Sequence, residues 1–212
     1  MSLHLAHNFL SEDDAEHLLD EVLHMPADWW FTAYKANDTR VIENKAVDAK
    51  QIYELDNTLI SLMRENKFIY RFRRTTDHVK GCTCFLCKVR ERALKTFLKG
   101  FVEEQLNLKN LELGEYFLSS YRQGDFLSTH TDQGKGVAAF VLNLTKDWRP
   151  EYGGMLHVET SPNCYTAVNP EFNSLAIMEI KEGEDLNHFV SEVTKSAPDN
   201  RIALSGWFVQ GN

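Results

Sequence analysis

A histidine and an aspartate, His130 and Asp132, stand two residues apart at the end of the segment YRQGDFLSTHTD (residues 121–132). On an extended backbone, residues i and i+2 project to the same face, so both side chains can reach one metal ion. A second histidine would complete a set of two imidazoles and one carboxylate, which suits Fe(II) and leaves coordination positions open for catalysis. A His-x-Asp pair alone also arises by chance, so the assignment depends on the residues that accompany it.

Two histidines, His157 and His188, follow Asp132 in the sequence, and Arg201 comes thirteen residues after the second of them, at the start of the run RIALSGWF. 2-Oxoglutarate chelates iron through its 1-carboxylate and keto oxygen, and its distal carboxylate needs a fixed, permanently charged fork such as a guanidinium. No comparable anchor follows His157, and Arg149 lies in the turn-like run DWRPEYGG, where we expect it to be exposed. The sequence therefore predicts His188 as the third iron ligand and Arg201 as the anchor.

Five runs in the same order carry a resemblance to a known family. They are YxxGxxLxxHxD (121–132), FVLNLTKDWRPEYGG (140–154), NSL (173–175), HFVSEV (188–193) and RIALSGWF (201–208). Together they resemble the prolyl hydroxylase branch of the Fe(II)- and 2-oxoglutarate-dependent dioxygenases, especially the members that hydroxylate a proline in a ribosomal protein and their bacterial relatives. The resemblance covers residues 113–209, and the N-terminal half is similar to the family only in having helices.

The resemblance assigns roles to individual residues. A tyrosine of the family that hydrogen-bonds the co-substrate is matched by Tyr121, and some relatives carry a second tyrosine where this chain has Leu142 and Asn143. That second contact is then either absent or replaced by the Asn143 amide. The resemblance also implies ascorbate as a reductant of the iron, and no catalytic side chain beyond the metal ligands. The implied iron ligands are His130, Asp132 and His188, with Arg201 paired to the distal carboxylate.

The activity implied by the resemblance is hydroxylation of a substrate C–H bond with O2 and 2-oxoglutarate, giving succinate and CO2 as co-products. A prolyl residue in a protein or peptide is the expected target. The same chemistry on a free amino acid or another small molecule stays open, because loops that one sequence cannot decode determine the substrate. A third interpretation is a metal-binding jelly roll that serves as a sensor or interaction module without catalysis. A broken ligand set or a lost anchor would mark it, and the sequence shows neither.

Beyond residue 113, short runs rich in β-branched and aromatic residues alternate with Gly, Pro, Asn and Asp. Seven such runs predict a double-stranded β-helix, or jelly roll, so the expected fold class is mainly β with flanking helices (α+β). Ser205 shares a strand face with Arg201 and is expected to be a filler, with contact to the site as the alternative. Trp207 and Phe208 are expected to close the core. The predicted strands are 115–122, 137–145, 155–159, 165–168, 174–180, 189–194 and 201–209.

Helical periodicity dominates the N-terminal half. Ser11 precedes three acidic residues, which is the signature of a helix N-cap, and apolar residues at helical spacing follow it. Two more amphipathic patterns occupy residues 52–63 and 89–102. We expect one domain over residues 1–212, with 1–110 as a helical buttress that contains a basic, cysteine-bearing segment and 111–212 as the jelly-roll catalytic core.

Residues 67–99 hold ten Lys or Arg against two acidic residues, although the net charge of the chain is −8. Such a run is most often a solvated helix face. Aromatic residues interleave with it at Phe68, Tyr70 and Phe72, so docking of an acidic protein or an RNA-associated substrate is a second interpretation. The overall negative charge argues against direct, sequence-specific binding of nucleic acid.

Four soft ligands, His78, Cys82, Cys84 and Cys87, lie within ten residues of one another. They are compatible with a tetrahedral Zn(II) site, although the spacing differs from paired Cys-x-x-Cys knuckles. An ordinary loop of reduced cysteines and a redox role are the alternatives. No apolar run approaches the roughly 20 residues needed to cross a bilayer, and the first residues lack the features of a signal peptide. A cytoplasmic protein without a membrane segment is therefore expected.

Overall fold

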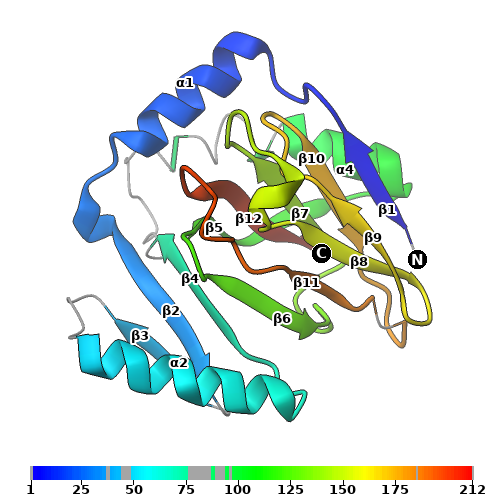
Figure 1. Cartoon of the computed structure of the whole chain (residues 1–212). Helices are drawn as coiled ribbons and strands as arrows, with labels where there is room; N and C mark the ends of the chain where they lie inside the picture. The colour runs from blue at the N-terminus through cyan, green and yellow to red at the C-terminus, as the bar shows by residue number, and fades with distance from the viewer. Residues whose placement is uncertain are drawn as a thin grey trace.

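Eight antiparallel strands of the C-terminal half form a two-layered barrel in the computed structural model, which describes residues 2–36, 39–43, 49–75, 87–88, 94–95, 97–184 and 186–211. Only the backbone of residues 39–43 and 49–52 is described. One layer has the strand order β10-β7-β12-β5 and the other β6-β11-β8-β9 (Figure 1). The strands are β5 (Leu111–Tyr121), β6 (Phe126–His130), β7 (Ala138–Asn143), β8 (Leu156–Ser161), β9 (Cys164–Val168), β10 (Leu175–Glu179), β11 (His188–Val190) and β12 (Arg201–Gln210).

Apart from the β8–β9 hairpin, successive strands along the chain thus move between the two layers, as in a jelly roll. The predicted double-stranded β-helix is confirmed, and each of the seven predicted strands is present with bounds shifted by a few residues. The short strand β6 was not predicted, because the segment around it is rich in polar residues. Within the part of the chain that the structure describes, no helix is both long and apolar enough to cross a bilayer.

Side-chain alternation along the strands separates the inside of the barrel from its outside. On β12, Arg201, Ser205 and Trp207 line the interior cavity. Leu204 and Phe208 from the same strand are fully buried on the other face, within the apolar cluster that also receives the helices. Polar side chains can therefore line the interior of the barrel, while the outer face of the sheet carries much of the apolar core.

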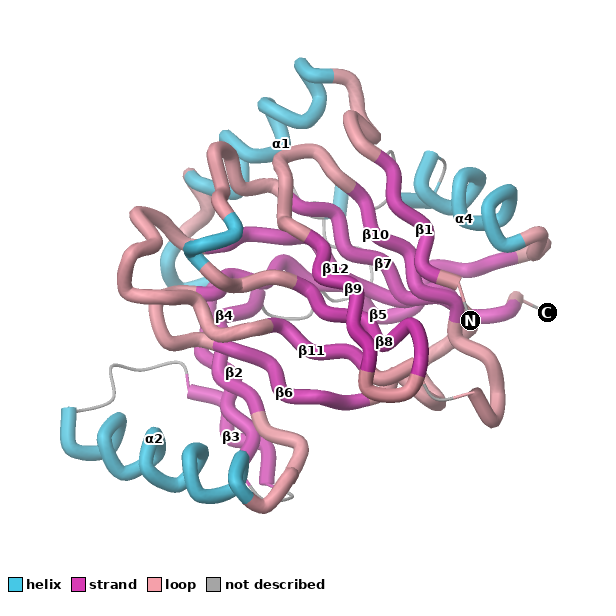
Figure 2. The backbone as a smooth tube through the Cα atoms, turned by 45° about the vertical axis from the view of Figure 1, so that its right-hand side comes forward, coloured by secondary structure: helices cyan, strands magenta, loops and turns pink. Residues whose placement is uncertain are grey.

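Among the described residues, three α-helices cover the barrel and its extension. Ser11 caps α1 (Glu12–Leu23), as predicted, because its hydroxyl accepts a hydrogen bond from the Asp14 N–H at 3.2 Å. The described part of the third predicted helix is α4 (Lys99–Leu106), preceded by buried Leu94 and Leu98. These residues and α1 pack on the outer face of the β10-β7-β12-β5 layer. The second predicted helix is α2 (Ala49–Arg64), which packs on β2 instead (Figure 2).

The prediction of a purely helical N-terminal half was wrong, since that half also contributes strands. β1 (Leu3–Ala6) pairs with β10 at one edge of the barrel. β4 (Tyr70–Thr75) pairs with both β5 and β6, so it joins the two layers and builds one wall of the cavity. β2 (Trp30–Ala36) and β3 (Thr39–Glu43) continue outward from β4 (Figure 2). These pairings are long-range, and the arginine-rich sequence of β4 concealed its alternation.

Candidate active site

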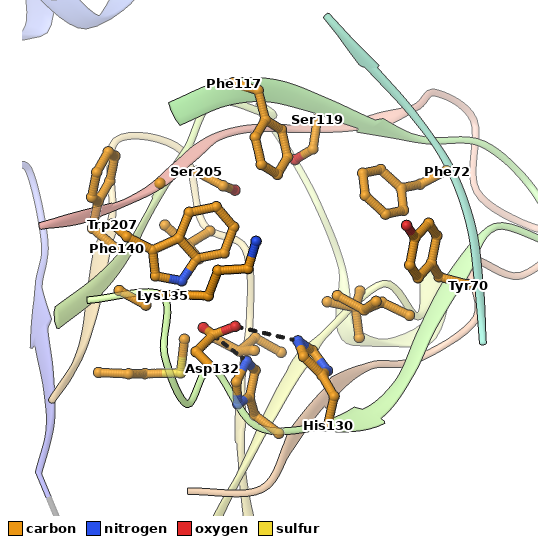
Figure 3. A pocket seen from close by; sticks show the side chains of 18 of the residues that line it. Tyr70, Phe72, Phe117, Ser119, His130, Asp132, Lys135, Phe140, Ser205 and Trp207 are labelled. Atoms are coloured by element: carbon orange, nitrogen blue, oxygen red, sulfur yellow. Dashed lines mark ion pairs between the residues drawn. The ribbon is translucent and has the colours of Figure 1, made fainter. Parts of the chain in front are cut away.

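Strand pairing brings the three predicted metal ligands together. His130 ends β6, Asp132 follows two residues later, and His188 begins β11 directly opposite His130 in the antiparallel register. The Nε2 atoms of His130 and His188 lie 3.7 Å and 3.4 Å from the two carboxylate oxygens of Asp132 (Figure 3). One ligand atom from each residue falls within 4.8 Å of the others. The geometry therefore supports the predicted facial set of two imidazoles and one carboxylate.

Backbone carbonyls fix the tautomer of both histidines. The Nδ1 atom of His130 lies 3.0 Å from the Ser128 carbonyl oxygen, and that of His188 lies 2.9 Å from the Leu186 carbonyl oxygen. A carbonyl can only accept, so each Nδ1 carries the proton and each Nε2 presents a lone pair to the centre of the set. This arrangement is the one that orients imidazole ligands in metal sites.

The charges of the set match a divalent cation. Burial and the neighbouring His188 lower the pKa of His130 to about 4, so its imidazole is neutral at neutral pH. Burial alone would raise the pKa of Asp132, but the nearby His188 and His130 and the Trp207 N–H lower it below its usual value. Deprotonated ligands are what metal binding requires. A neutral His130 imidazole and the Asp132 carboxylate are therefore ready at neutral pH, and two imidazoles with one carboxylate form a donor set that suits Fe(II).

Arg201 carries a buried positive charge without an acidic partner among the described residues. It begins β12 opposite Tyr121 and is 2% exposed. One Nη donates to the Asn143 Oδ1 at 3.2 Å, while the Nε has no hydrogen-bond partner within the described chain. Burial lowers the pKa of its guanidinium. An isolated buried cation is costly unless something pairs with it. Arg201 is therefore suited to pair with a carboxylate, and its role as the anchor for 2-oxoglutarate stays a prediction.

The neighbours of Arg201 hold it in place. The guanidinium lies 5.1 Å from the centroid of the Tyr121 ring, and Phe72 stacks on that ring with centroids 5.0 Å apart. Burial raises the pKa of Tyr121, so its hydroxyl stays protonated and can donate a hydrogen bond. Asn143 uses both ends of its amide, accepting from Arg201 and donating to the Ser174 hydroxyl at 3.1 Å. Asn143 thus orients Arg201, and it is not among the residues that line the cavity.

The three predicted metal ligands and Arg201 open onto one cavity of about 210 Å³ between the two layers. Strands from both layers and β4 contribute to its wall, which is largely aromatic (Figure 3). Ser119 and Ser205 add hydroxyl groups, and three charged residues stand among the remaining lining residues. The aromatic residues are Phe68, Tyr70, Phe72, Phe117, Tyr121, Phe140 and Trp207, and the charged ones are Arg74, Glu115 and Lys135.

Several lining residues were missed or misjudged from the sequence. Trp207, which was expected to close the core, lies in the cavity wall, and Ser205 joins it there. Both could have been found, because they alternate with Arg201 along one strand face. Lys135 could not, since its position depends on a loop. His157 stacks on Phe189 with ring centroids 4.4 Å apart and lies outside the cavity, while Arg149 is exposed, as expected.

The basic segment is only partly a solvated face. Arg71 lies on β4 and pairs with Asp125 at 2.9 Å and also with Asp56, while Arg74 is 4% exposed in the cavity wall. The interpretation as a solvated helix face was therefore wrong for the arginines of β4. Lys88 and Lys95 are exposed. Of the predicted zinc ligands, Cys87 is buried, whereas the others lie outside the described residues, so the zinc site stays a prediction. Those others are His78, Cys82 and Cys84.

Trp207 is placed to orient Asp132, one of the predicted metal ligands. Its indole N–H is buried, points at the Asp132 carboxylate (Figure 3) and helps to lower the pKa of that carboxyl. Outer-shell donors to metal ligands typically change metal affinity 10- to 100-fold. Trp207→Phe is therefore expected to weaken Mn(II) binding about tenfold, measured by isothermal titration calorimetry. Trp148→Phe is the control, because its indole N–H donates to the Gly153 carbonyl at 2.9 Å. Equal Mn(II) affinity in the two variants would contradict this role.

Comparison with known proteins agrees with this geometry. Residues 116–209 match the family model of the 2OG-Fe(II) oxygenase superfamily. A prolyl-4-hydroxylase from Pseudomonas putida has a TM-score of 0.63 at 18% identity, over 98% of this chain and 92% of that one. A 2OG-Fe(II) oxygenase family oxidoreductase from Burkholderia pseudomallei has a TM-score of 0.64 at 10% identity, over 99% of this chain and 86% of that one.

A third similar structure contains a peptide. It is a prolyl hydroxylase from Trichoplax adhaerens in complex with a fragment of the oxygen degradation domain of hypoxia inducible factor. Its TM-score is 0.60 at 15% identity, over 98% of this chain and 83% of that one. Identities this low show a shared fold. Comparison with curated protein sequences gives no significant match.

Proposed function

We propose that the chain is an Fe(II)- and 2-oxoglutarate-dependent dioxygenase that hydroxylates a prolyl residue in a protein, because residues 116–209 match the family model of the 2OG-Fe(II) oxygenase superfamily. The co-products would be succinate and CO2. The observation that carries the proposal is that the three metal ligands and the unpaired, buried Arg201 line one cavity. A metal-binding module without catalysis would not need a buried cation placed for a co-substrate carboxylate.

His130, Asp132 and His188 would hold the iron. Bound there, Fe(II) supplies the activation of O2 coupled to oxidative decarboxylation of 2-oxoglutarate. The protein contributes two imidazoles whose Nδ1 atoms face backbone carbonyls, of which that of His130 is held neutral, and a carboxylate that balances part of the metal charge. Arg201 binds the distal carboxylate of the co-substrate through its guanidinium fork. Tyr121, kept neutral by burial, offers a hydroxyl donor on the same side of the barrel.

The wall of the cavity supports a saturated ring as the group that reacts. Tyr70, Phe72, Phe117 and Trp207 line it, and several of these rings are in contact with one another. A pyrrolidine ring is compact and apolar, so it can pack against aromatic faces without leaving an unpaired polar group. Aromatic walls also exclude water from the reacting bond. Two of the structures with this fold are named as prolyl hydroxylases, one of them bound to a peptide, which favours a polypeptide substrate.

The test of this function uses mass spectrometry. Incubated with Fe(II), 2-oxoglutarate and O2, the protein should form succinate. When a cell extract is added as the source of substrates, a protein in that extract should gain 16 Da at one prolyl residue. Ascorbate, the reductant implied by the family resemblance, should raise the number of turnovers. Omission of 2-oxoglutarate is the control. Succinate formation together with a 16 Da gain on a free amino acid, and on no protein, would overturn the protein substrate and keep the oxygenase chemistry.

A further inference from the structure

One flexible positive charge reaches into the cavity beside the iron ligands. Lys135 follows Asp132 by three residues, and its backbone N–H donates to the Asp132 carbonyl at 3.0 Å. Its ammonium lies 5.2 Å from the centroid of the Trp207 ring. Figure 3 shows the side chain extending from the loop into the space between Trp207 and the metal ligands. A group bound near the iron would therefore meet this charge.

The loop that carries Lys135 is held on both sides. The Gln133 amide donates to the carbonyls of Lys181 and Glu184, at 2.8 Å each. Gly136 packs so closely on β12 that a Cβ there would lie 2.2 Å from the Phe208 carbonyl oxygen. The backbone position of Lys135 is thus fixed, while its four-carbon stem lets the ammonium move. The loop therefore fixes the backbone of Lys135 three residues after Asp132, while the ammonium at the end of the side chain can change position.

The present partner of Lys135 is a carboxylate that holds it weakly. Glu115 lies 3.6 Å from the Lys135 ammonium, and their side chains are 37% and 52% exposed. Such surface pairs contribute little to stability, about 0–1 kcal/mol. The other oxygen of Glu115 is bound by Arg74 at 3.0 Å, and Arg74 is itself buried and lies 3.9 Å from the Phe117 ring centroid. Glu115 is therefore held by Arg74, and Lys135 can exchange its contact at little cost.

From these contacts we propose that Lys135 determines substrate specificity by binding a carboxylate of the substrate in exchange for Glu115. This inference rests on the proposed prolyl hydroxylase function, and it names the substrate class as a proline with an acidic residue close to it in the sequence. Glu115 shows that a carboxylate fits against this ammonium. A phosphate group, with nearly two negative charges, would exceed the single charge that Lys135 provides.

The test uses blocked pentapeptides with a central proline, alanine elsewhere and one glutamate at one of the four flanking positions, each with a glutamine twin. Binding is measured by calorimetry on protein loaded with Mn(II) and 2-oxoglutarate, so it does not depend on turnover. For at least one position, the glutamate peptide should bind about fivefold more tightly than its twin, as expected for one partly screened charge pair. Lys135→Met should remove the difference, and Lys135→Glu should favour a lysine peptide over the glutamate peptide.

Lys146→Met is the matched control, because Lys146 also pairs with a single carboxylate, that of Glu16, but lies outside the cavity. It should keep the preference of the unmodified protein. Equal binding of all glutamate and glutamine twins, absence of any binding, or a preference that survives in Lys135→Met would overturn the inference. L-Proline and L-prolinamide form a separate arm. A Lys135-dependent preference for L-proline over L-prolinamide, without a preference among the peptides, would indicate that Lys135 binds the carboxylate of a free amino acid. That result would overturn the acidic-peptide class.

The same peptides separate this inference from the proposed function when the protein is loaded with Fe(II). Hydroxylation of glutamate and glutamine twins at equal rates would overturn the role of Lys135 and keep the prolyl hydroxylase proposal. A Lys135-dependent binding preference without any 16 Da gain would keep the carboxylate site and overturn proline as the target.

Discussion

Alanine in place of either His130 or Asp132 is expected to abolish the 2-oxoglutarate-dependent formation of succinate. Each residue supplies one of three ligand atoms that fall within 4.8 Å of one another, so either substitution leaves two ligands. Loss of outer-shell partners alone typically costs 10- to 100-fold in metal affinity or activity. Loss of a ligand should cost more, so we expect turnover to fall by more than about 100-fold. The measurement is succinate release under saturating Fe(II), together with Mn(II) affinity by calorimetry.

Two further variants make this result specific. Asp132→Asn keeps the shape of the side chain but removes its charge, so it should also lose Mn(II) affinity while folding normally. His157→Ala is the matched control, because His157 lies on β8, the strand that pairs with β11. Its ring stacks on Phe189 instead of facing the metal ligands. It should retain turnover. Normal iron-dependent turnover in His130→Ala and Asp132→Ala would disprove the ligand assignment.

The part of the site that could be predicted from the sequence is the part encoded by strand geometry. His130 and Asp132 are two residues apart on an extended segment, and Arg201 begins a run with clear alternation. His188 was chosen because Arg201 follows it, and the register of β11 against β6 then placed it opposite His130. Local spacing and strand order were thus enough to predict the three side chains that the fold brings together. The same alternation along β12 would also have identified Trp207.

The part that could not be predicted depends on pairing between distant segments. β4 supplies Tyr70, Phe72 and Arg74 to the cavity, and it does so only because it bridges β5 and β6. Nothing in its sequence shows that Arg71 meets Asp56 and Asp125, which lie 15 and 54 residues away. An arginine-rich run is typical of a solvated surface, so the composition of β4 wrongly indicated an exposed segment. The residues that β4 contributes to the cavity could consequently be identified only from the structure.

Arg201 offers the second prediction with a large effect, because it is a buried cation whose polar neighbours in the described chain, Asn143 and Tyr121, are neutral. Arg201→Ala should raise the KM for 2-oxoglutarate by about 100-fold or more, as is typical when one partner of a buried charge-assisted pair is removed. Mn(II) affinity should change little, since Arg201 does not belong to the ligand set. Arg201→Lys should recover only part of the loss, because an ammonium cannot reproduce the two parallel hydrogen bonds of the guanidinium fork.

The assignment of Arg201 to the distal carboxylate can be tested more directly with 2-oxopentanoate, which keeps the keto acid but lacks that carboxylate. The unmodified protein should discriminate strongly between 2-oxoglutarate and 2-oxopentanoate, and Arg201→Ala should lose most of this discrimination. Arg149→Ala, at an exposed arginine outside the cavity, is the control and should discriminate as the unmodified protein does. If Arg201→Ala still prefers 2-oxoglutarate as strongly, another residue binds the distal carboxylate. Because the comparison is a ratio within each protein, a general loss of activity or stability cannot imitate the expected result.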